Sequence, residues 1–157
     1  MQLLMKQRVF SWGNTFDIYD TNQKPVYLCK SQVFSIKRKL RVFDMDNNEL
    51  VYIEQQIWKF MPHYDIYING EKVCTMIQKF SFAYHRFYFQ DIDWIVQGDF
   101  WAHNYCVQSK DETVLTVSKK WFSWGDTYII DINSQHDPVL ALAVAIVLDC
   151  VCHDNKN

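Results

Sequence analysis

Residues 10–18 read Phe-Ser-Trp-Gly-Asn-Thr-Phe-Asp-Ile, and residues 122–130 return the pattern as Phe-Ser-Trp-Gly-Asp-Thr-Tyr-Ile-Ile. Weaker copies of the aromatic motif lie between them, at residues 33–36, 57–60, 79–82 and 100–103. The motifs recur every 21 to 24 residues. A fixed period of this size indicates one supersecondary unit that is used repeatedly, so the repeat predicts an architecture more directly than an activity.

The segments between the motifs carry turn signals flanked by alternating apolar residues. Asn69-Gly70 is the clearest turn signal, because both central residues of a type I′ turn need positive φ. Before it, Tyr64, Ile66 and Ile68 would share one face of a strand. The same analysis along the chain predicts twelve strands, at about residues 3–10, 14–20, 25–34, 37–44, 50–58, 63–69, 71–80, 84–90, 94–101, 104–109, 113–121 and 126–132.

A meander of twelve strands with free edges would invite edge-to-edge aggregation, so we expect the sheet to close into a barrel. A barrel this wide exceeds the roughly eight strands whose own side chains fill the interior. The segment Val139–Leu148 is apolar on every face and follows Asp137-Pro138, a signal for the start of a helix. The prediction is an all-β fold: a closed antiparallel barrel around a buried hydrophobic C-terminal helix at about residues 138–152.

The helix is too short to cross a bilayer, because ten uninterrupted apolar residues fall below the roughly 20 that a membrane span needs. We therefore expect no transmembrane span. Asp149 interrupts the apolar run, and in a barrel core its carboxylate must find hydrogen-bond donors. Residues 1–154 are predicted to form a single domain, followed by a tail of residues 155–157.

Composition points to a folded cytoplasmic protein. The net charge is −2 and the pI about 6.2, which gives no general attraction to nucleic acid or to anionic membranes. Any anion-binding site must then be a local patch, and no nucleic-acid partner is expected. The chain has no signal-peptide pattern, and its cysteines are odd in number, so reduced and mostly buried thiols are expected. They are Cys29, Cys74, Cys106, Cys150 and Cys152.

Several spaced motifs together resemble the LURP-one-related family, in particular its small bacterial members. They are the twin Phe-Ser-Trp-Gly motifs, Gly98–His103, Lys119–Tyr128, Leu140–Val144 and Asp149-Cys150. The resemblance covers essentially the whole chain. That family belongs with the Tubby C-terminal domain and the phospholipid scramblases, so the resemblance implies a twelve-stranded β-barrel around a central hydrophobic helix, compatible with the architecture inferred from the repeat.

For function the resemblance implies less. Tubby domains are associated with phosphoinositide head groups, scramblases with calcium-dependent lipid movement, and plant LURP-one proteins with defence. No lipid-binding residue of Tubby can be matched to a position of this chain.

The densest basic run is Ile36–Arg41. On a strand, Lys37, Lys39 and Arg41 would point to one side, where three cations could hold a phosphate head group by charge-assisted hydrogen bonds. The alternative is a solvated strand face that discourages edge pairing.

Four tryptophans lie at or beside the repeat junctions: Trp12, Trp58, Trp101 and Trp124. Because the junctions recur with the repeat, several of these rings are expected at one end of the barrel. They would form a docking rim for protein or lipid, or they would plug the barrel mouth and cover the helix end.

The sequence contains no paired nucleophile and base, no G-x-S-x-G, no P-loop and no H-E-x-x-H, so no catalytic residue or cofactor site is expected. Asp131, Asn133, Gln135 and Asp137 alternate as in a calcium loop, but the glycine and final glutamate of an EF-hand are missing. Asp137 more simply caps the helix. Cys150, Cys152, His153 and Asp154 come from a single segment, whereas a structural zinc site draws ligands from two.

The leading hypothesis is a non-enzymatic cytoplasmic binding module for anionic or phosphorylated ligands, such as phospholipid head groups at a membrane surface. The alternative is a protein-interaction scaffold that uses the aromatic rim. A scramblase-like lipid protein is the third hypothesis.

Overall fold

The computed structural model describes residues 1–6, 15–34, 37–80, 85–99, 102–122 and 125–154. Twelve antiparallel strands form a closed barrel in which each strand lies beside its neighbours in sequence, and β1 also pairs with β12. The strands are β1 (Gln2–Lys6), β2 (Thr15–Tyr19), β3 (Pro25–Phe34), β4 (Lys37–Asp44), β5 (Glu49–Gln55), β6 (His63–Ile68), β7 (Glu71–Phe80), β8 (His85–Gln90), β9 (Trp94–Asp99), β10 (Asn104–Ser109), β11 (Glu112–Phe122) and β12 (Gly125–Ile132).

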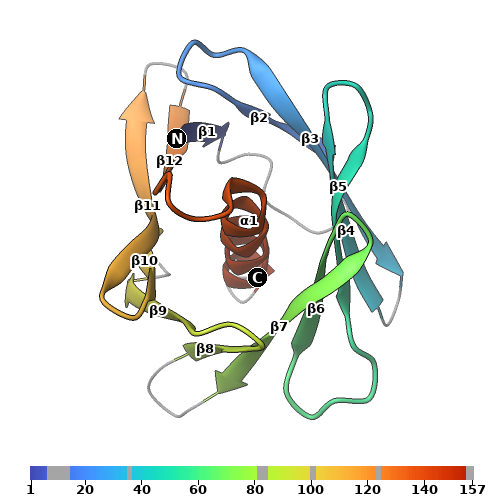
Figure 1. The fold of residues 1–157 in the computed structure, drawn as a ribbon. Helices are drawn as coiled ribbons and strands as arrows, with labels where there is room; N and C mark the ends of the chain where they lie inside the picture. The colour runs from blue at the N-terminus through green and yellow to red at the C-terminus, as the bar shows by residue number, and fades with distance from the viewer. Residues whose placement is uncertain (7–14, 35–36, 81–84, 100–101, 123–124, 155–157) are drawn as a thin grey trace.

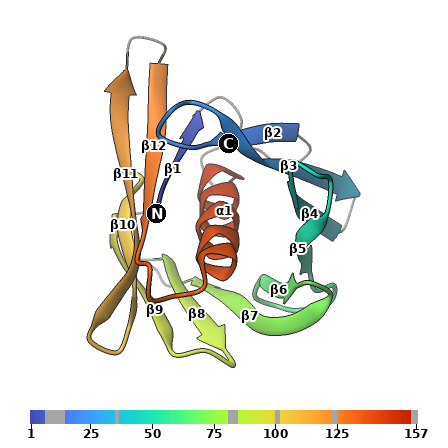
Figure 2. The ribbon, with the colours of Figure 1, turned by 45° about the horizontal axis from the view of Figure 1, so that its top comes forward.

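The helix α1 (Pro138–Asp154) runs through the middle of the barrel (Figures 1 and 2). Every residue from Ala141 to Leu148 is fully buried, which confirms the predicted core helix. Apolar residues at alternate strand positions surround it, among them Leu3, Met5, Ile18, Leu40, Ile53, Ile66, Met76 and Ile130. Because the helix meets strands on all sides, it has no polar face.

The connections of the barrel alternate between its two ends. One end, here called the motif end, is where β1, β3, β5, β7, β9 and β11 finish and the repeated aromatic motifs connect them to the next strand. The other end, called the turn end, holds the tight turns and the start of α1. Since α1 begins after β12, it finishes at the motif end.

The turn end shows the predicted turn chemistry. Asn69 and Gly70 adopt positive φ values of 50° and 85°, as a type I′ turn requires. In the turn after β4, Asp44 Oδ1 accepts hydrogen bonds from the backbone N–H groups of Asp46 and Asn48, at 3.0 and 2.8 Å. At the start of α1, Asp137 Oδ1 accepts from the N–H groups of Val139 and Leu140, which confirms its predicted role as the helix cap.

The structure corrects one strand boundary that bears on function. The prediction continued the fifth strand to Trp58, but β5 ends at Gln55. Trp58 has a φ of 67°, a left-handed conformation that a strand does not contain. Of the predicted strand 3–10, residues 7–10 lie outside the described residues.

Two seams of the barrel are weakly paired. Among the described residues, Tyr88 and Ile95 are the one register pair between β8 and β9, and Leu4 and Tyr19 are the one pair between β1 and β2. By contrast, β8 and β9 each share six partner pairs with their other neighbour, β7 or β10. Within the part of the chain that the structure describes, pairing is therefore sparsest at these two seams.

Ala143→Asp should abolish cooperative folding, because Ala143 is fully buried in α1 and a carboxylate there would lack a partner. Ala102→Asp is the matched control, since Ala102 is exposed, and it should change the free energy of unfolding by no more than about 0.5 kcal/mol. Urea unfolding followed by circular dichroism measures both. A stable, cooperatively unfolding Ala143→Asp variant would show that the helix is not the core.

Candidate functional site

The connection between β5 and β6 displays the most exposed aromatic residues of the described structure. Trp58 is 94% exposed and Phe60 97% exposed, while Ile57 before them is 39% exposed. Lys59 lies between the two rings and is also exposed. We call residues 57–60 the aromatic loop. Trp58 therefore covers neither the barrel mouth nor the helix end, so the docking alternative fits this residue better than the plug.

Hydrogen bonds fix the base of the aromatic loop, which comprises Gln56, His63 and Asp65 and is here called the stem. The backbone N–H of Gln56 donates to the carbonyl of His63 at 2.8 Å, which closes the loop at its base. The Gln56 side-chain amide donates to both carboxylate oxygens of Asp65, at 2.8 and 2.9 Å. These hydrogen bonds hold the base of the loop that carries the two exposed rings.

Asp65 is the centre of this stem. Besides Gln56, its carboxylate accepts from the Thr75 hydroxyl at 2.6 Å and pairs with Lys72 Nζ at 2.8 Å. Burial alone would raise the pKa of the Asp65 carboxyl. The hydrogen bonds from Lys72, Thr75 and Gln56 outweigh burial and hold the pKa below its ordinary value.

The predicted cationic patch lies on the outer face of β4, beside this loop. Lys37, Lys39 and Arg41 alternate there with Leu40 and Val42, which are buried in the core. Lys39 is the register partner of Glu54 on β5, the strand that leads into the aromatic loop. Lys37 and Lys39 are thus close to the stem, while Arg41 lies further toward the turn end.

Two carboxylates of β5 form ion pairs with cations of the patch, and the sequence did not predict these pairs. Lys37 Nζ lies 2.6 Å from Glu54 Oε2, and Arg41 Nε lies 3.1 Å from Glu49 Oε2. Burial alone would raise the pKa of Glu54. Hydrogen bonds from Lys37 and Tyr52, together with the charges of Lys37 and Lys39, outweigh burial and hold the pKa below its ordinary value. An anionic ligand at this patch would compete with Glu54 and Glu49 for the cations.

The two ends of the barrel carry opposite charge. Cations at or near the motif end are Lys6, Lys37, Arg38, Lys39, Lys59, Lys79, Arg86, Lys119 and Lys120. Carboxylates at or near the turn end are Asp20, Asp44, Asp46, Glu49, Glu71, Asp91, Asp93, Asp111, Glu112 and Asp137. Exceptions such as Glu54 and Asp99 at the motif end, and Lys24 and Lys110 at the turn end, are fewer. The net charge of −2 conceals this polarity.

The other residues of the predicted rim, Trp12, Trp101 and Trp124, lie outside the described residues. Sequence reasoning missed Lys59 and Phe60 as candidate site residues, although both belong to a recognised copy of the motif. The available signal was that Lys59 falls at a position that the alternation of β5 would direct into the barrel.

The carboxylate of Asp149 is fully buried, and two potential donors lie near one of its oxygens, Oδ1. Tyr105 OH lies 3.3 Å from both Asp149 Oδ1 and the Ala145 carbonyl, and its one proton serves one of these acceptors at a time. His103 Nδ1 lies 3.3 Å from Asp149 Oδ1. The His103 ring also packs against Tyr128, with centroids 4.6 Å apart. Asp149 is fully buried and His103 is 3% exposed, so this cluster anchors the helix end to β10 and presents no surface to a substrate.

The residues considered for metal binding have other roles where they are described. Asn133 donates from its side chain to the Thr113 carbonyl, and Asp137 caps α1. Among the described residues, no group of three or more His, Cys, Asp or Glu side chains is arranged to hold a metal ion. The side chains of Cys152, His153 and Asp154 lie outside the description. Cys29, Cys74 and Cys150 are buried as expected, while Cys106 is half-buried.

The described helix does not reach the length and hydropathy that a membrane-crossing helix needs.

Comparison with known proteins agrees with this architecture. The sequence model of a family described as LURP-one-related matches residues 1–149. The uncharacterized protein YxjI of Bacillus subtilis is 33% identical over 157 residues, which cover 100% of this chain and 97% of that protein. The X-ray structure of an Arabidopsis thaliana protein superposes with a TM-score of 0.64 over 96% of this chain and 91% of that one. Its sequence identity of 16% makes it evidence for the fold alone.

Asp65→Asn should lower the free energy of unfolding at pH 7 by about 1–3 kcal/mol, because the charge-assisted bonds to Lys72 and Gln56 are weakened. The folded-state pKa of Asp65 is depressed, so its stabilisation is complete above the unfolded-state value of 3.8 and disappears as pH falls through the folded pKa. The difference between wild type and variant should therefore shrink only below about pH 4.

Urea unfolding between pH 7 and pH 3 measures this difference, with Asp111→Asn, an exposed carboxylate of a turn, as the control. A difference that is already absent at pH 7 would show that Asp65 does not hold the stem.

Proposed function

The chain belongs to the LURP-one-related family, and from that premise we propose that it is a non-enzymatic binding module that docks its motif end on anionic phospholipid surfaces. The aromatic loop would enter the interface between head groups and acyl chains. The cations around it would contact phosphates. The binding site in this proposal comprises Trp58, Lys59 and Phe60, together with Lys37, Lys39 and Arg41 of the patch.

The aromatic loop is the observation that carries the proposal. Two aromatic rings that are almost fully exposed gain nothing from packing within the barrel, and large apolar groups displayed together mark contact surfaces. Tryptophan favours the interface of a membrane, where its ring is partly apolar and partly hydrated. A lysine between the rings can reach outward to head groups while its stem remains in the interface.

The charge polarity supports an oriented encounter. Each Lys or Arg held near an anionic membrane surface contributes about 1 kcal/mol of attraction, which salt screens within a Debye length. A barrel with cations at one end and carboxylates at the other turns its motif end toward such a surface. The turn end is repelled, so the proposal predicts one orientation.

Binding is favoured over catalysis because the described polar groups near the motif end are engaged structurally. The His103–Asp149 pair is closed to solvent, and the Asp65 carboxylate holds the loop stem. No paired nucleophile and base emerges among the described side chains. The second candidate function is binding of a protein partner that covers Trp58 and Phe60. Such binding would not depend on the charge of lipid vesicles, unlike the first candidate.

Co-sedimentation with liposomes across a salt series tests the proposal. Vesicles with anionic phospholipid should bind the protein, neutral phosphatidylcholine vesicles should bind it at least tenfold more weakly, and binding should fade as salt rises. The double variant Lys39→Glu/Lys59→Glu should abolish binding. The matched double variant Lys24→Glu/Lys110→Glu changes the net charge equally but at the turn end, so it should keep most of the binding.

Equal losses in the two double variants would make the effect one of net charge and contradict an oriented site. Binding to neither vesicle type would overturn the lipid proposal and favour the protein scaffold. The same assay tests the patch: Glu54→Gln removes the carboxylate that competes for Lys37, so it should strengthen binding to anionic vesicles.

Trp58→Gly should separate stability from binding. A non-glycine residue at positive φ costs about 1–2 kcal/mol, and Trp58 loses no packing when it is removed, so glycine should raise the free energy of unfolding by up to about 1 kcal/mol. Vesicle binding should nevertheless fall several-fold. Thermal unfolding and co-sedimentation of the same preparation give both values. A variant that binds anionic vesicles as wild type does would exclude Trp58 from the interface.

A further inference from the structure

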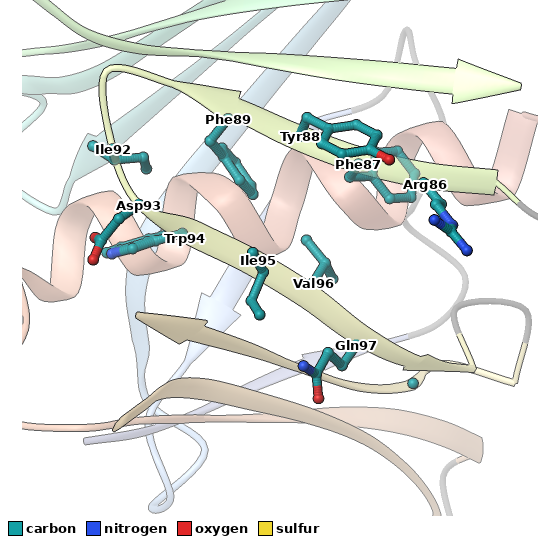
Figure 3. A pocket seen from close by; sticks show the side chains of 11 residues that line it. Arg86, Phe87, Tyr88, Phe89, Ile92, Asp93, Trp94, Ile95, Val96 and Gln97 are labelled. Atoms are coloured by element: carbon teal, nitrogen blue, oxygen red, sulfur yellow. The ribbon is translucent and has the colours of Figure 1, made fainter. Parts of the chain in front are cut away.

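The seam between β8 and β9 opens into a cleft of about 690 Å³. The two strands meet at the turn through residues 91–93 and diverge toward Arg86 and Gln97, with α1 behind them (Figure 3). Tyr88 and Ile95 are the one register pair among the described residues of β8 and β9, so the other described residues on the facing edges are not paired across this seam. The cleft therefore widens toward the motif end and has the size of a site for a small molecule.

The walls of the cleft are apolar. Phe87 and Trp94 are nearly buried beneath it, and Phe89 contacts Trp94 edge to face at 6.4 Å between ring centroids. Tyr88 and Ile95 flank the opening and are 40% and 47% exposed, an unusual exposure for large apolar residues within strands. A ligand in the cleft would remove this apolar surface from water.

The two ends of the cleft differ in charge. At the wide end, Arg86 on β8 is the register partner of Lys79 on β7, and both are exposed. Lys79 Nζ lies 4.5 Å from the centre of the Tyr88 ring, and within the described structure neither cation is paired with a carboxylate. At the narrow end the Ser109 hydroxyl donates to Asp93 at 2.9 Å. Arg86 thus lines the wide end of the cleft, and Lys79 lies beside it on the neighbouring strand.

We propose that this cleft binds a single-chain anionic amphiphile. Its carboxylate or phosphate pairs with Arg86 and Lys79, and its hydrocarbon chain lies between the Phe87–Phe89 wall and the Trp94–Val96 wall. Charge complementarity favours this occupant. A neutral apolar molecule would form no ion pair with the two cations, and a free anion would bury no surface against the apolar walls. The proposal does not rest on membrane docking, since the amphiphile can enter from solution.

Isothermal titration calorimetry of the full chain with palmitate, below its critical micelle concentration, tests the cleft without vesicles. We expect one palmitate per chain, with hexadecanol, the uncharged analogue of equal length, about tenfold weaker because the charge-assisted hydrogen bonds are lost. Lysophosphatidate in a second arm distinguishes a phosphate head group from a carboxylate. Inorganic phosphate alone should not bind.

Two exposed positions give variants that leave the core intact. Arg86→Gln should lower the affinity for palmitate about tenfold. Ile95→Glu should abolish palmitate binding, because it places a carboxylate against the hydrocarbon chain of the ligand. Met45→Glu is the matched control, because it places a glutamate at a similarly exposed apolar residue outside the cleft, and palmitate affinity should be unchanged.

Equal affinity for hexadecanol and palmitate would overturn the proposal, as would an Ile95→Glu variant that binds as wild type does. Binding of inorganic phosphate with the affinity of palmitate would reduce the site to an anion site and contradict the role of the walls. Because no vesicle is present, none of these results bears on docking of the motif end.

Discussion

The structure depends on filling a barrel of twelve strands, whose interior is wider than strand side chains alone can occupy. The helix α1 meets this need with a surface that is apolar on every side, so every strand can direct its alternate apolar residues inward. The exception, Asp149, is tolerated because Tyr105 and His103 lie against its carboxylate. Once the helix occupies the axis, the strands can close, and their connections must alternate between two ends.

Because the connections alternate between two ends, acidic turn residues and aromatic connections lie at opposite ends of the barrel. The tight turns, with their capping carboxylates such as Asp44 and Asp137, fall at one end, and the aromatic connections fall at the other. Most of the cations lie on strand ends beside the aromatic connections. A chain with a net charge of −2 thereby presents a cationic, aromatic surface at one end, and both the aromatic loop and the wide mouth of the β8–β9 cleft are found there.

The sequence predicted those features that depend on periodicity. The repeat and the alternation in segments such as Tyr64–Ile68 fixed the strand count and the inward faces, and the all-apolar run fixed the helix. The ion pair of Lys37 with Glu54 could not be predicted, because it depends on the register between β4 and β5, which alternation does not determine. The sequence left open whether Trp58 docks or plugs, and it placed the end of the fifth strand at Trp58 instead of Gln55, because the hydrogen bonds between Gln56 and Asp65 depend on tertiary structure. The cleft arises from an absence of pairing that no local pattern encodes.

The dependence of the barrel on its helix is tested most directly by a chain that stops at Asp137. Without α1, the inward apolar residues would line an empty interior, so the account predicts a chain that neither unfolds cooperatively in urea nor shows dispersed amide resonances. The matched measurement on the full chain should show both properties. A soluble truncated chain with a cooperative urea transition and dispersed resonances would contradict the account, because the barrel would then stand without its core.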